Sequence, residues 1–296
     1  KPDTLVKYKS IGSVDLYLHV FLPDNETRNR SCIVFFFGGG WTIGVPCQFY
    51  PQASYFAALG MVAFCAEYRI LSKHGTTPFE CVKDARSAMR WIKSNGDVFS
   101  IDTSKIVASG GSAGGHLAAG TAVLTSINEE MDDMGISPSP CALVLFNPAI
   151  RSSKGIDTMI VRFGERWRQL SVYHNIGDDF PPCLIMHGTK DAKVPVENVI
   201  DFRDLLVKMN DGTWYGPERD HADARRTGTP DLPEGYTWQK TGDSSSVLGV
   251  EPNGEGWVAT QLSGCSLVTG GYELIGPDGS PLTRIAVFIR VNPCKG

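Results

Sequence analysis

A five-residue run, Gly-Gly-Ser-Ala-Gly at residues 110–114, limits the folds open to this chain more than any other feature. It follows an apolar run at 105–109 that is typical of a buried strand, and it leads into a run at 113–127 that is typical of a helix. Such a turn is too tight for large side chains beside the serine, which explains the small neighbours. The pattern G-x-S-x-G in this context predicts a turn that lifts the Ser112 hydroxyl above a parallel sheet.

Short apolar runs alternate with helical stretches along the first two thirds of the chain. Most of these runs carry apolar residues on both faces, as strands covered by helices on either side do. The predicted strands are residues 15–22, 32–37, 61–66, 105–109, 142–146 and 183–187. One predicted helix begins after Thr77, with Pro78 at its first position and Glu80 placed for a capping box, and another spans 196–209. The alternation predicts the α/β class, a doubly wound and mostly parallel sheet.

The composition changes after about residue 221. Residues 225–235 are rich in Gly, Pro and Thr, and the runs beyond them are short and separated by turn signals. We therefore predict an α/β catalytic domain at 1–223 and a β-rich extension at 224–296. The extension is either an accessory unit or a replacement for a final helix that covers the edge of the sheet.

Charge and cysteine content exclude several kinds of partner. The net charge is −4 at pH 7 without a basic cluster, so we expect neither a nucleic acid nor an anionic membrane as partner. The eight cysteines lack the spacing of a zinc site, so we expect no metal. Four of them lie in apolar runs and are expected to be buried thiols: Cys32, Cys65, Cys141 and Cys183. Cys265 and Cys294, in the extension, are candidates for a disulfide.

A glycine loop, Phe-Gly-Gly-Gly-Trp at residues 37–41, directly follows an apolar run of strand length. Acyl transfer on a serine creates an oxyanion, and preorganised backbone N–H groups stabilise it. Such a loop acts together with the N–H that follows the nucleophile. The predicted donors are therefore Gly39, Gly40 and Ala113. Trp41, beside the loop, is predicted to border the substrate pocket and to limit acyl length.

The candidate acid is Asp191, which follows the predicted strand 183–187 at its carboxyl end. Open α/β sheets bind ligands at this edge, and an aspartate there holds a catalytic histidine in the right tautomer. A helix cap is the alternative role for Asp191. Because the chain order is nucleophile, acid, histidine, the base is His221, the only one of six histidines after Asp191. A solvated loop histidine is the alternative for His221. His116 shares the helix after Ser112 and is expected to pack or cap locally.

Four segments carry a resemblance to a known family: residues 35–41, 66–69, 74–81 and 110–116. They resemble bacterial esterases of the hormone-sensitive-lipase-like group of α/β-hydrolases, and most closely the acetyl-xylan-esterase-like members. The likeness covers about residues 5–221. It implies hydrolysis of short acyl esters, such as acetyl groups on plant or algal polysaccharides, and it implies the triad and oxyanion roles assigned above.

The chain departs from that family at two places. Phe37 stands where many relatives have a histidine, although the backbone N–H groups do the chemical work. His221 is followed by Ala-Asp and a glycine-rich tail, where relatives usually have Gly-Phe and a final helix.

The sequence therefore predicts a serine carboxylesterase that forms an acyl-enzyme on Ser112, without a cofactor. Its substrate would be a small-molecule or oligosaccharide ester. Two other interpretations stay open: a prolyl-oligopeptidase-like peptidase, because residues 187–191 also resemble the acid loop of those enzymes, and an inactive binding protein of the same fold. Turnover of p-nitrophenyl acetate against a peptide amide separates all three. The natural ester, the oligomeric state and the compartment are not fixed by the sequence.

Overall fold

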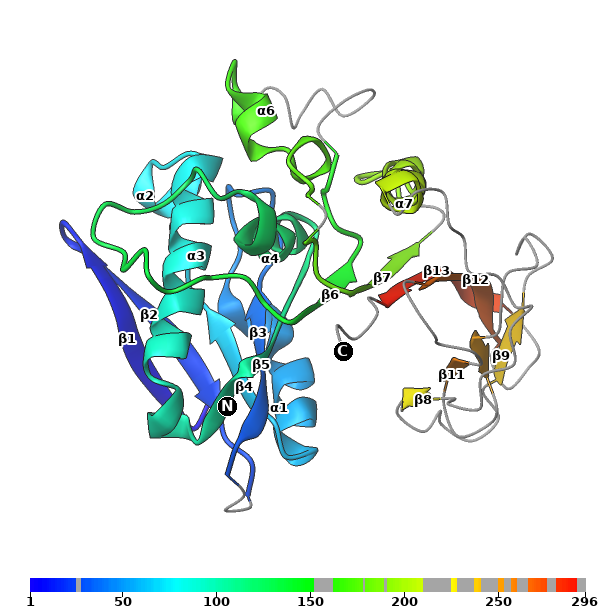
Figure 1. Cartoon of the computed structure of the whole chain (residues 1–296), viewed down its shortest axis with the longest axis horizontal. Coiled ribbons are helices and arrows are strands. Elements are labelled where there is room, and N and C mark those ends of the chain that lie inside the picture. The colour runs from blue at the N-terminus through cyan, green and yellow to red at the C-terminus, as the bar shows by residue number, and fades with distance from the viewer. Residues whose placement is uncertain are drawn as a thin grey trace. The chain divides into compact units, whose positions relative to one another are not determined.

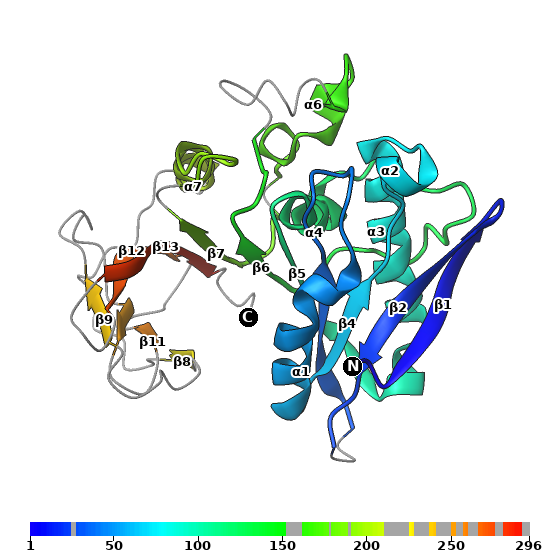
Figure 2. The ribbon, with the colours of Figure 1, turned by 180° about the vertical axis from the view of Figure 1, so that it is seen from behind.

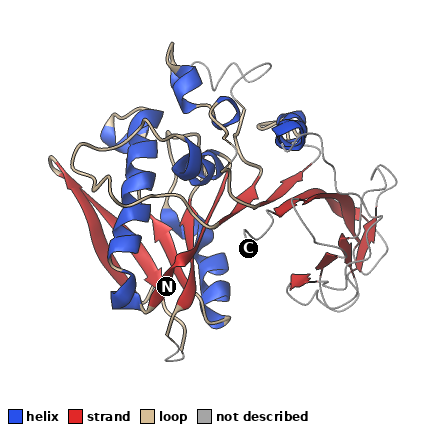
Figure 3. Ribbon diagram, viewed as in Figure 1, coloured by secondary structure: helices blue, strands red, loops and turns tan. Residues whose placement is uncertain are grey.

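The computed structural model divides the chain into two compact units, Lys1–Pro181 and Pro182–Gly296. It describes residues 1–24, 28–151, 162–177, 179–188 and 191–209, and beyond them six strands (Figures 1 and 3). Within these ranges, no helix combines the length and the apolar character that crossing a membrane requires.

The first unit contains a sheet with the strand order β1-β2-β4-β3-β5-β6. Its strands are β1 (Thr4–Ile11), β2 (Val14–Phe21), β3 (Arg30–Phe36), β4 (Val62–Ala66), β5 (Ile101–Gly111) and β6 (Ala142–Phe146). The pairs β1–β2 and β2–β4 are antiparallel, whereas β4, β3, β5 and β6 run parallel. Phe36 lies opposite Gly110 in the β3–β5 register, so the loops that follow these two strands emerge at the same edge of the sheet.

Helices cover both faces of this sheet, which confirms the predicted α/β fold. The described helices of this unit are η1 (Pro46–Phe49), α1 (Tyr50–Ala58), α2 (Leu71–His74), α3 (Pro78–Ser94), η2 (Gly96–Phe99), α4 (Ala113–Val123), α6 (Trp167–Leu170) and η3 (Val172–His174). Figures 1 and 2 show α3 and α4 on one face and α1 on the other. Every residue of β4 is buried, because helices lie over both of its faces.

The start of α3 has the predicted capping box. The Thr77 hydroxyl accepts a hydrogen bond from the Phe79 N–H at 3.3 Å, and the Glu80 carboxylate accepts one from the Thr77 N–H at 2.8 Å. These two bonds satisfy backbone donors that the first turn of a helix leaves without an intrahelical partner.

A buried group of charges ties the first strand to distant parts of the unit. The Asp84 carboxylate on α3 is fully buried and accepts hydrogen bonds from Lys9 Nζ at 2.6 Å and from the Arg69 guanidinium at 2.8 Å. Glu129 accepts from the same two cations, at 2.9 Å each. A buried carboxylate is costly unless it is paired, so this group stabilises only as a complete set.

The second unit begins with β7 (Cys183–Gly188) and α7 (Glu197–Met209). The strands that follow are β8 (Arg225–Thr227), β9 (Thr237–Lys240), β10 (Val250–Pro252), β11 (Trp257–Ala259), β12 (Ser266–Ile275) and β13 (Pro281–Val291). They form the order β7-β13-β12-β9 and a small sheet β10-β11-β8. β13 pairs antiparallel with β7, with Ile285 opposite Gly188.

The compact units do not follow the predicted domain division. The break between them comes after Pro181, whereas the predicted boundary at 223/224 lies outside the described residues. The predicted extension supplies β13, which pairs with β7 and thereby covers an edge of that strand. The assignment of 224–296 as a separate extension stays a prediction.

Three of the four cysteines expected inside, Cys32, Cys65 and Cys183, are buried. The fourth prediction is wrong, because Cys141 is exposed. It lies one residue before β6, where the chain is still in the preceding loop, and its N–H donates to the Ile106 carbonyl. Cys265 and Cys294 lie outside the described residues.

Candidate functional site

Ser112 occupies the turn between β5 and α4 with a strained backbone. Its φ is +52° and its ψ is −116°, a region that residues with a Cβ rarely adopt. Two hydrogen bonds hold the turn: the Ser112 N–H donates to the carbonyl of Phe146, the last residue of β6, at 2.9 Å, and the Ser112 carbonyl accepts from the N–H of Ala149, in the loop after β6, at 3.1 Å. The side chain is half-buried. This is the geometry that the motif predicts for a nucleophile turn.

Glycines flank Ser112 because the backbones approach each other too closely for a Cβ. A Cβ on Gly110 would lie 2.5 Å from the backbone of Gly114. A Cβ on Gly114 would lie 2.0 Å from the carbonyl oxygen of Phe36, at the end of β3. The small residues therefore let α4 start directly against the sheet.

The glycine loop lies beside the nucleophile. A Cβ on Gly38 would be 3.5 Å from the Cβ of Ser112. Gly39 and Gly40 have φ values of +133° and +60°, so the loop needs residues without a Cβ. None of the hydrogen bonds between described residues uses the N–H of Gly39, Gly40 or Ala113. The loop thus has donors to offer a ligand, and their role as an oxyanion hole stays a prediction.

Two side chains outside the loop fix its first residues, and the sequence analysis missed both. The Gln48 amide on η1 makes two hydrogen bonds to Gly38: its Oε1 accepts from the N–H at 2.8 Å and its Nε2 donates to the carbonyl at 3.2 Å. The Tyr68 hydroxyl donates to the Phe37 carbonyl at 2.7 Å, and the two rings stack with centroids 4.0 Å apart. No motif indicates Gln48, because its role depends on how the chain returns after the loop.

His116 connects the loop with α4 and with a later segment. It is fully buried, and its Nε2 lies 2.6 Å from the Leu170 carbonyl, so Nε2 carries the proton. Nδ1 then accepts from the indole N–H of Trp41 at 3.3 Å. Burial lowers the pKa of His116 to about 4, so the ring is neutral near pH 7. His116 was expected to pack or cap locally; it is buried, but its hydrogen-bond partners Trp41 and Leu170 are distant in sequence, so the local role is wrong.

Trp41 itself is only 3% exposed, and its ring packs edge-on against Phe163 with centroids 4.8 Å apart. Its predicted place at the border of the substrate pocket stays a prediction.

The predicted acid and base are not joined to this site by the described structure. Asp191 belongs to the second unit, where its Oδ1 accepts from the N–H groups of Lys193 at 2.8 Å and Val194 at 2.9 Å. His221 lies outside the described residues. The structure therefore brings together Ser112 and the glycine loop, while the other two triad positions stay predictions.

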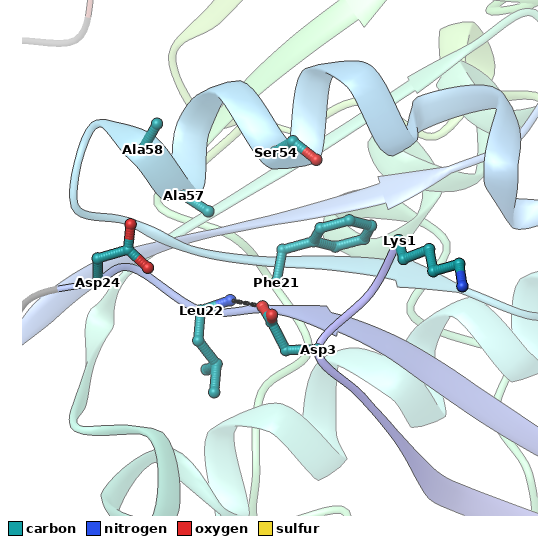
Figure 4. Close-up of a pocket in the computed structure, with 8 residues that line it drawn as sticks. All are labelled: Lys1, Asp3, Phe21, Leu22, Asp24, Ser54, Ala57 and Ala58. Atoms are coloured by element: carbon teal, nitrogen blue, oxygen red, sulfur yellow. Dashed lines mark hydrogen bonds between the residues drawn. The ribbon is translucent and has the colours of Figure 1, made fainter.

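A separate shallow pocket of about 170 Å³ lies away from Ser112 (Figure 4). It is lined by Lys1, Asp3, Phe21, Leu22, Asp24, Ser54, Ala57 and Ala58. Phe21 is opposite Ala63 at the start of β4, so the pocket lies at the amino ends of the parallel strands. It holds no predicted site residue.

Within the described ranges, no three His, Cys, Asp or Glu side chains are grouped as metal ligands.

Known proteins resemble this chain over its first two thirds. A domain model described as BD-FAE matches residues 18–140. Esterase LipC of Mycobacterium tuberculosis is 27% identical over 62% of this chain and 50% of that protein. Endo-1,4-beta-xylanase B of Butyrivibrio fibrisolvens is 28% identical over 67% of this chain and 32% of that protein. The chain thus spans half or less of these curated relatives.

Solved structures give a closer match. Esterase 2 of Thermogutta terrifontis is 42% identical, over 70% of this chain and 79% of that chain, with a TM-score of 0.66. Its structures include propionate-bound, butyrate-bound and paraoxon-phosphorylated forms. With this identity, this coverage and the Ser112 turn on a mostly parallel sheet, the chain belongs to the α/β-hydrolase esterases.

Proposed function

We propose that the protein hydrolyses short-chain carboxylic esters through an acyl-enzyme on Ser112. The observation that carries the proposal is the strained turn of Ser112 beside a glycine loop whose N–H groups make no hydrogen bond within the described residues. This arrangement suits a serine that attacks a carbonyl while backbone donors bind the oxyanion. The Thermogutta esterase is phosphorylated by paraoxon, which supports the presence of a reactive nucleophile in such a site.

The remaining steps follow from the predicted roles. His221, oriented by Asp191, takes the Ser112 proton as the hydroxyl attacks the ester carbonyl. The N–H groups of the glycine loop and of the residue after the nucleophile bind the negative oxygen. His221 then protonates the leaving alcohol and later activates the water that releases the acid.

We further propose that the acyl group is short, acetyl above all, and that the alcohol is a carbohydrate. Propionate and butyrate bind the Thermogutta esterase, which supports a short acyl group. A region of a xylanase is similar to this chain, which supports a polysaccharide ester. A bulky Trp41 after the glycine loop agrees with a limited acyl pocket.

A fluorophosphonate probe tests the nucleophile. We expect one label per chain, on Ser112, and we expect Ser112→Ala to lose about 10⁴-fold or more in turnover of p-nitrophenyl acetate while folding normally. Ser104→Ala is the matched control, because Ser104 is an exposed serine on the same strand. Labelling that survives Ser112→Ala would refute the proposal.

Two further measurements test the triad and the acyl length. Replacing Asp191 or His221 in the Ser112→Ala background should cost little more, because residues that act as a unit are not additive. An open apolar pocket would gain roughly 0.8 kcal/mol for each added methylene. Turnover that rises steadily from acetate to octanoate would therefore contradict a short acyl pocket.

A further inference from the structure

Residues 162–170, called here the arginine segment, contact the glycine loop in the first unit. The segment ends with α6 (Figures 1 and 2). The Arg162 Nη1 donates to the Gly40 carbonyl at 2.6 Å. The next residue, Phe163, lies edge-on against the Trp41 ring at the end of the loop. The carbonyl of Leu170, the last residue of the segment, accepts the hydrogen bond from the buried His116 imidazole. These contacts place the segment beside the residues that are predicted to hold the ester carbonyl.

The segment carries three arginines with exposed side chains. Arg162 binds a backbone carbonyl, Arg166 lies over the Phe79 ring at 4.2 Å, and Arg168 lies over the Trp167 ring at 5.0 Å. Among the described residues, no carboxylate forms an ion pair with any of the three. A ring face or a carbonyl orients a guanidinium without neutralising it. The segment also contains one carboxylate, Glu165, so it carries a net charge of +2 on a chain whose net charge is −4.

Arg162 has hydrogen-bond donors to spare. A guanidinium has five N–H donors in a planar fork, and one bond, to Gly40, accounts for Arg162 among the described residues. Its Cζ lies 3.0 Å from where a Cβ on Gly40 would be, so the guanidinium packs closely on this glycine. A planar fork of this kind matches a carboxylate in two parallel hydrogen bonds.

We infer that Arg162 forms an anion-binding subsite next to the glycine loop, and that the preferred esters carry a negative charge close to the scissile bond. An acidic sugar with an acylated hydroxyl has this chemistry. The inference rests on the proposed function, because it assumes that the ester carbonyl lies at Gly40. Positive charge beside a binding site also raises the rate at which anionic substrates arrive.

A matched pair of substrates tests the subsite with the whole chain. The esters 4-acetoxybenzoate and 4-acetoxybenzamide share the acetyl group and the ring, and only the first is charged near pH 7. We expect kcat/KM, corrected for the uncatalysed rates, to favour the anion by about tenfold or more, as a charge-assisted hydrogen bond would. The preference should shrink as ionic strength rises.

Three variants locate the effect. Arg162→Gln should abolish the preference, and Arg162→Lys should retain part of it, because it keeps the charge and loses the fork. Lys105→Gln is the matched control. Lys105 lies on β5, seven residues before Ser112, and its positive charge pairs with Asp102. The Lys105→Gln substitution should leave the preference unchanged.

The outcomes separate the subsite from the proposed function. Equal kcat/KM for the two esters in the unmodified protein overturns the subsite and leaves the esterase standing. Equal slowing of both esters by Arg162→Gln, with the preference intact, also overturns it, since Arg162 would then only position Gly40. If neither ester is turned over and Ser112 takes no label, the proposed function fails and the subsite fails with it.

Discussion

Acid should destabilise this protein through the buried imidazole of His116. Burial lowers the folded pKa of His116 to about 4, from an ordinary value of 6.5. Between these two values the unfolded chain binds a proton that the folded protein does not bind. The contribution of neutral His116 to the free energy of unfolding is therefore fully present above about pH 6.5, and it is lost as the pH falls toward 4. A second ring proton, on Nδ1, would also face the indole N–H of Trp41 across 3.3 Å, where it would have no acceptor.

The size of the effect follows from the two pKa values. Each tenfold change in proton affinity corresponds to about 1.4 kcal/mol, so the difference between 6.5 and about 4 amounts to about 3 kcal/mol of unfolding free energy at pH 4. This is a substantial part of the 5–15 kcal/mol that is typical of a domain.

Urea unfolding measures this loss of unfolding free energy. The unmodified protein and His116→Gln are each unfolded at pH 7 and at pH 4. Glutamine retains an Nε2 donor for the Leu170 carbonyl and does not titrate. The unmodified protein should lose about 3 kcal/mol more than the variant between the two pH values, since all other groups titrate in both. Equal losses in the two proteins would refute the reasoning.

Three further perturbations test the packing. Gly114→Ala should abolish the folded, active protein, because its Cβ would lie 2.0 Å from a carbonyl of β3; circular dichroism and soluble yield check this. Asp84→Asn should cost roughly 3–5 kcal/mol in urea unfolding, because Lys9 and Arg69 keep only Glu129 as a charged partner, whereas Asp15→Asn at an exposed pair should leave stability nearly unchanged. Removing residues 228–296 should uncover an edge of β7 and cause aggregation, seen by light scattering; a soluble, active product would show that the extension is accessory.

The sequence was sufficient wherever the cause of structure is local. The capping box of Thr77 and Glu80 and the turn at Ser112 depend on residues a few positions apart, and both occur as predicted. The parallel strands were found within a few residues of their bounds, because burial on both faces leaves a continuous apolar run. Cys141 was misplaced because the apolar run begins one residue before the strand.

Contacts between distant residues could not be predicted. Arg162 reaches Gly40 across 122 residues, and His116 reaches Leu170 across 54. No sequence spacing predicts either contact, because both depend on the path that the loops take in the folded chain. The pairing of β13 with β7 is of the same kind, and no sequence pattern in the tail indicates it.

That pairing has a consequence for synthesis on the ribosome. β7 ends at Gly188, and its partner β13 begins at Pro281, so about 90 residues separate the two strands. At roughly 5–20 residues per second, the emerging chain holds β7 without this neighbour for about 5–20 s. The polar backbone groups that β13 will pair with are open to other chains during that time. Nascent-chain yield should therefore depend on chaperones that shield this edge more than on the stability of the finished protein.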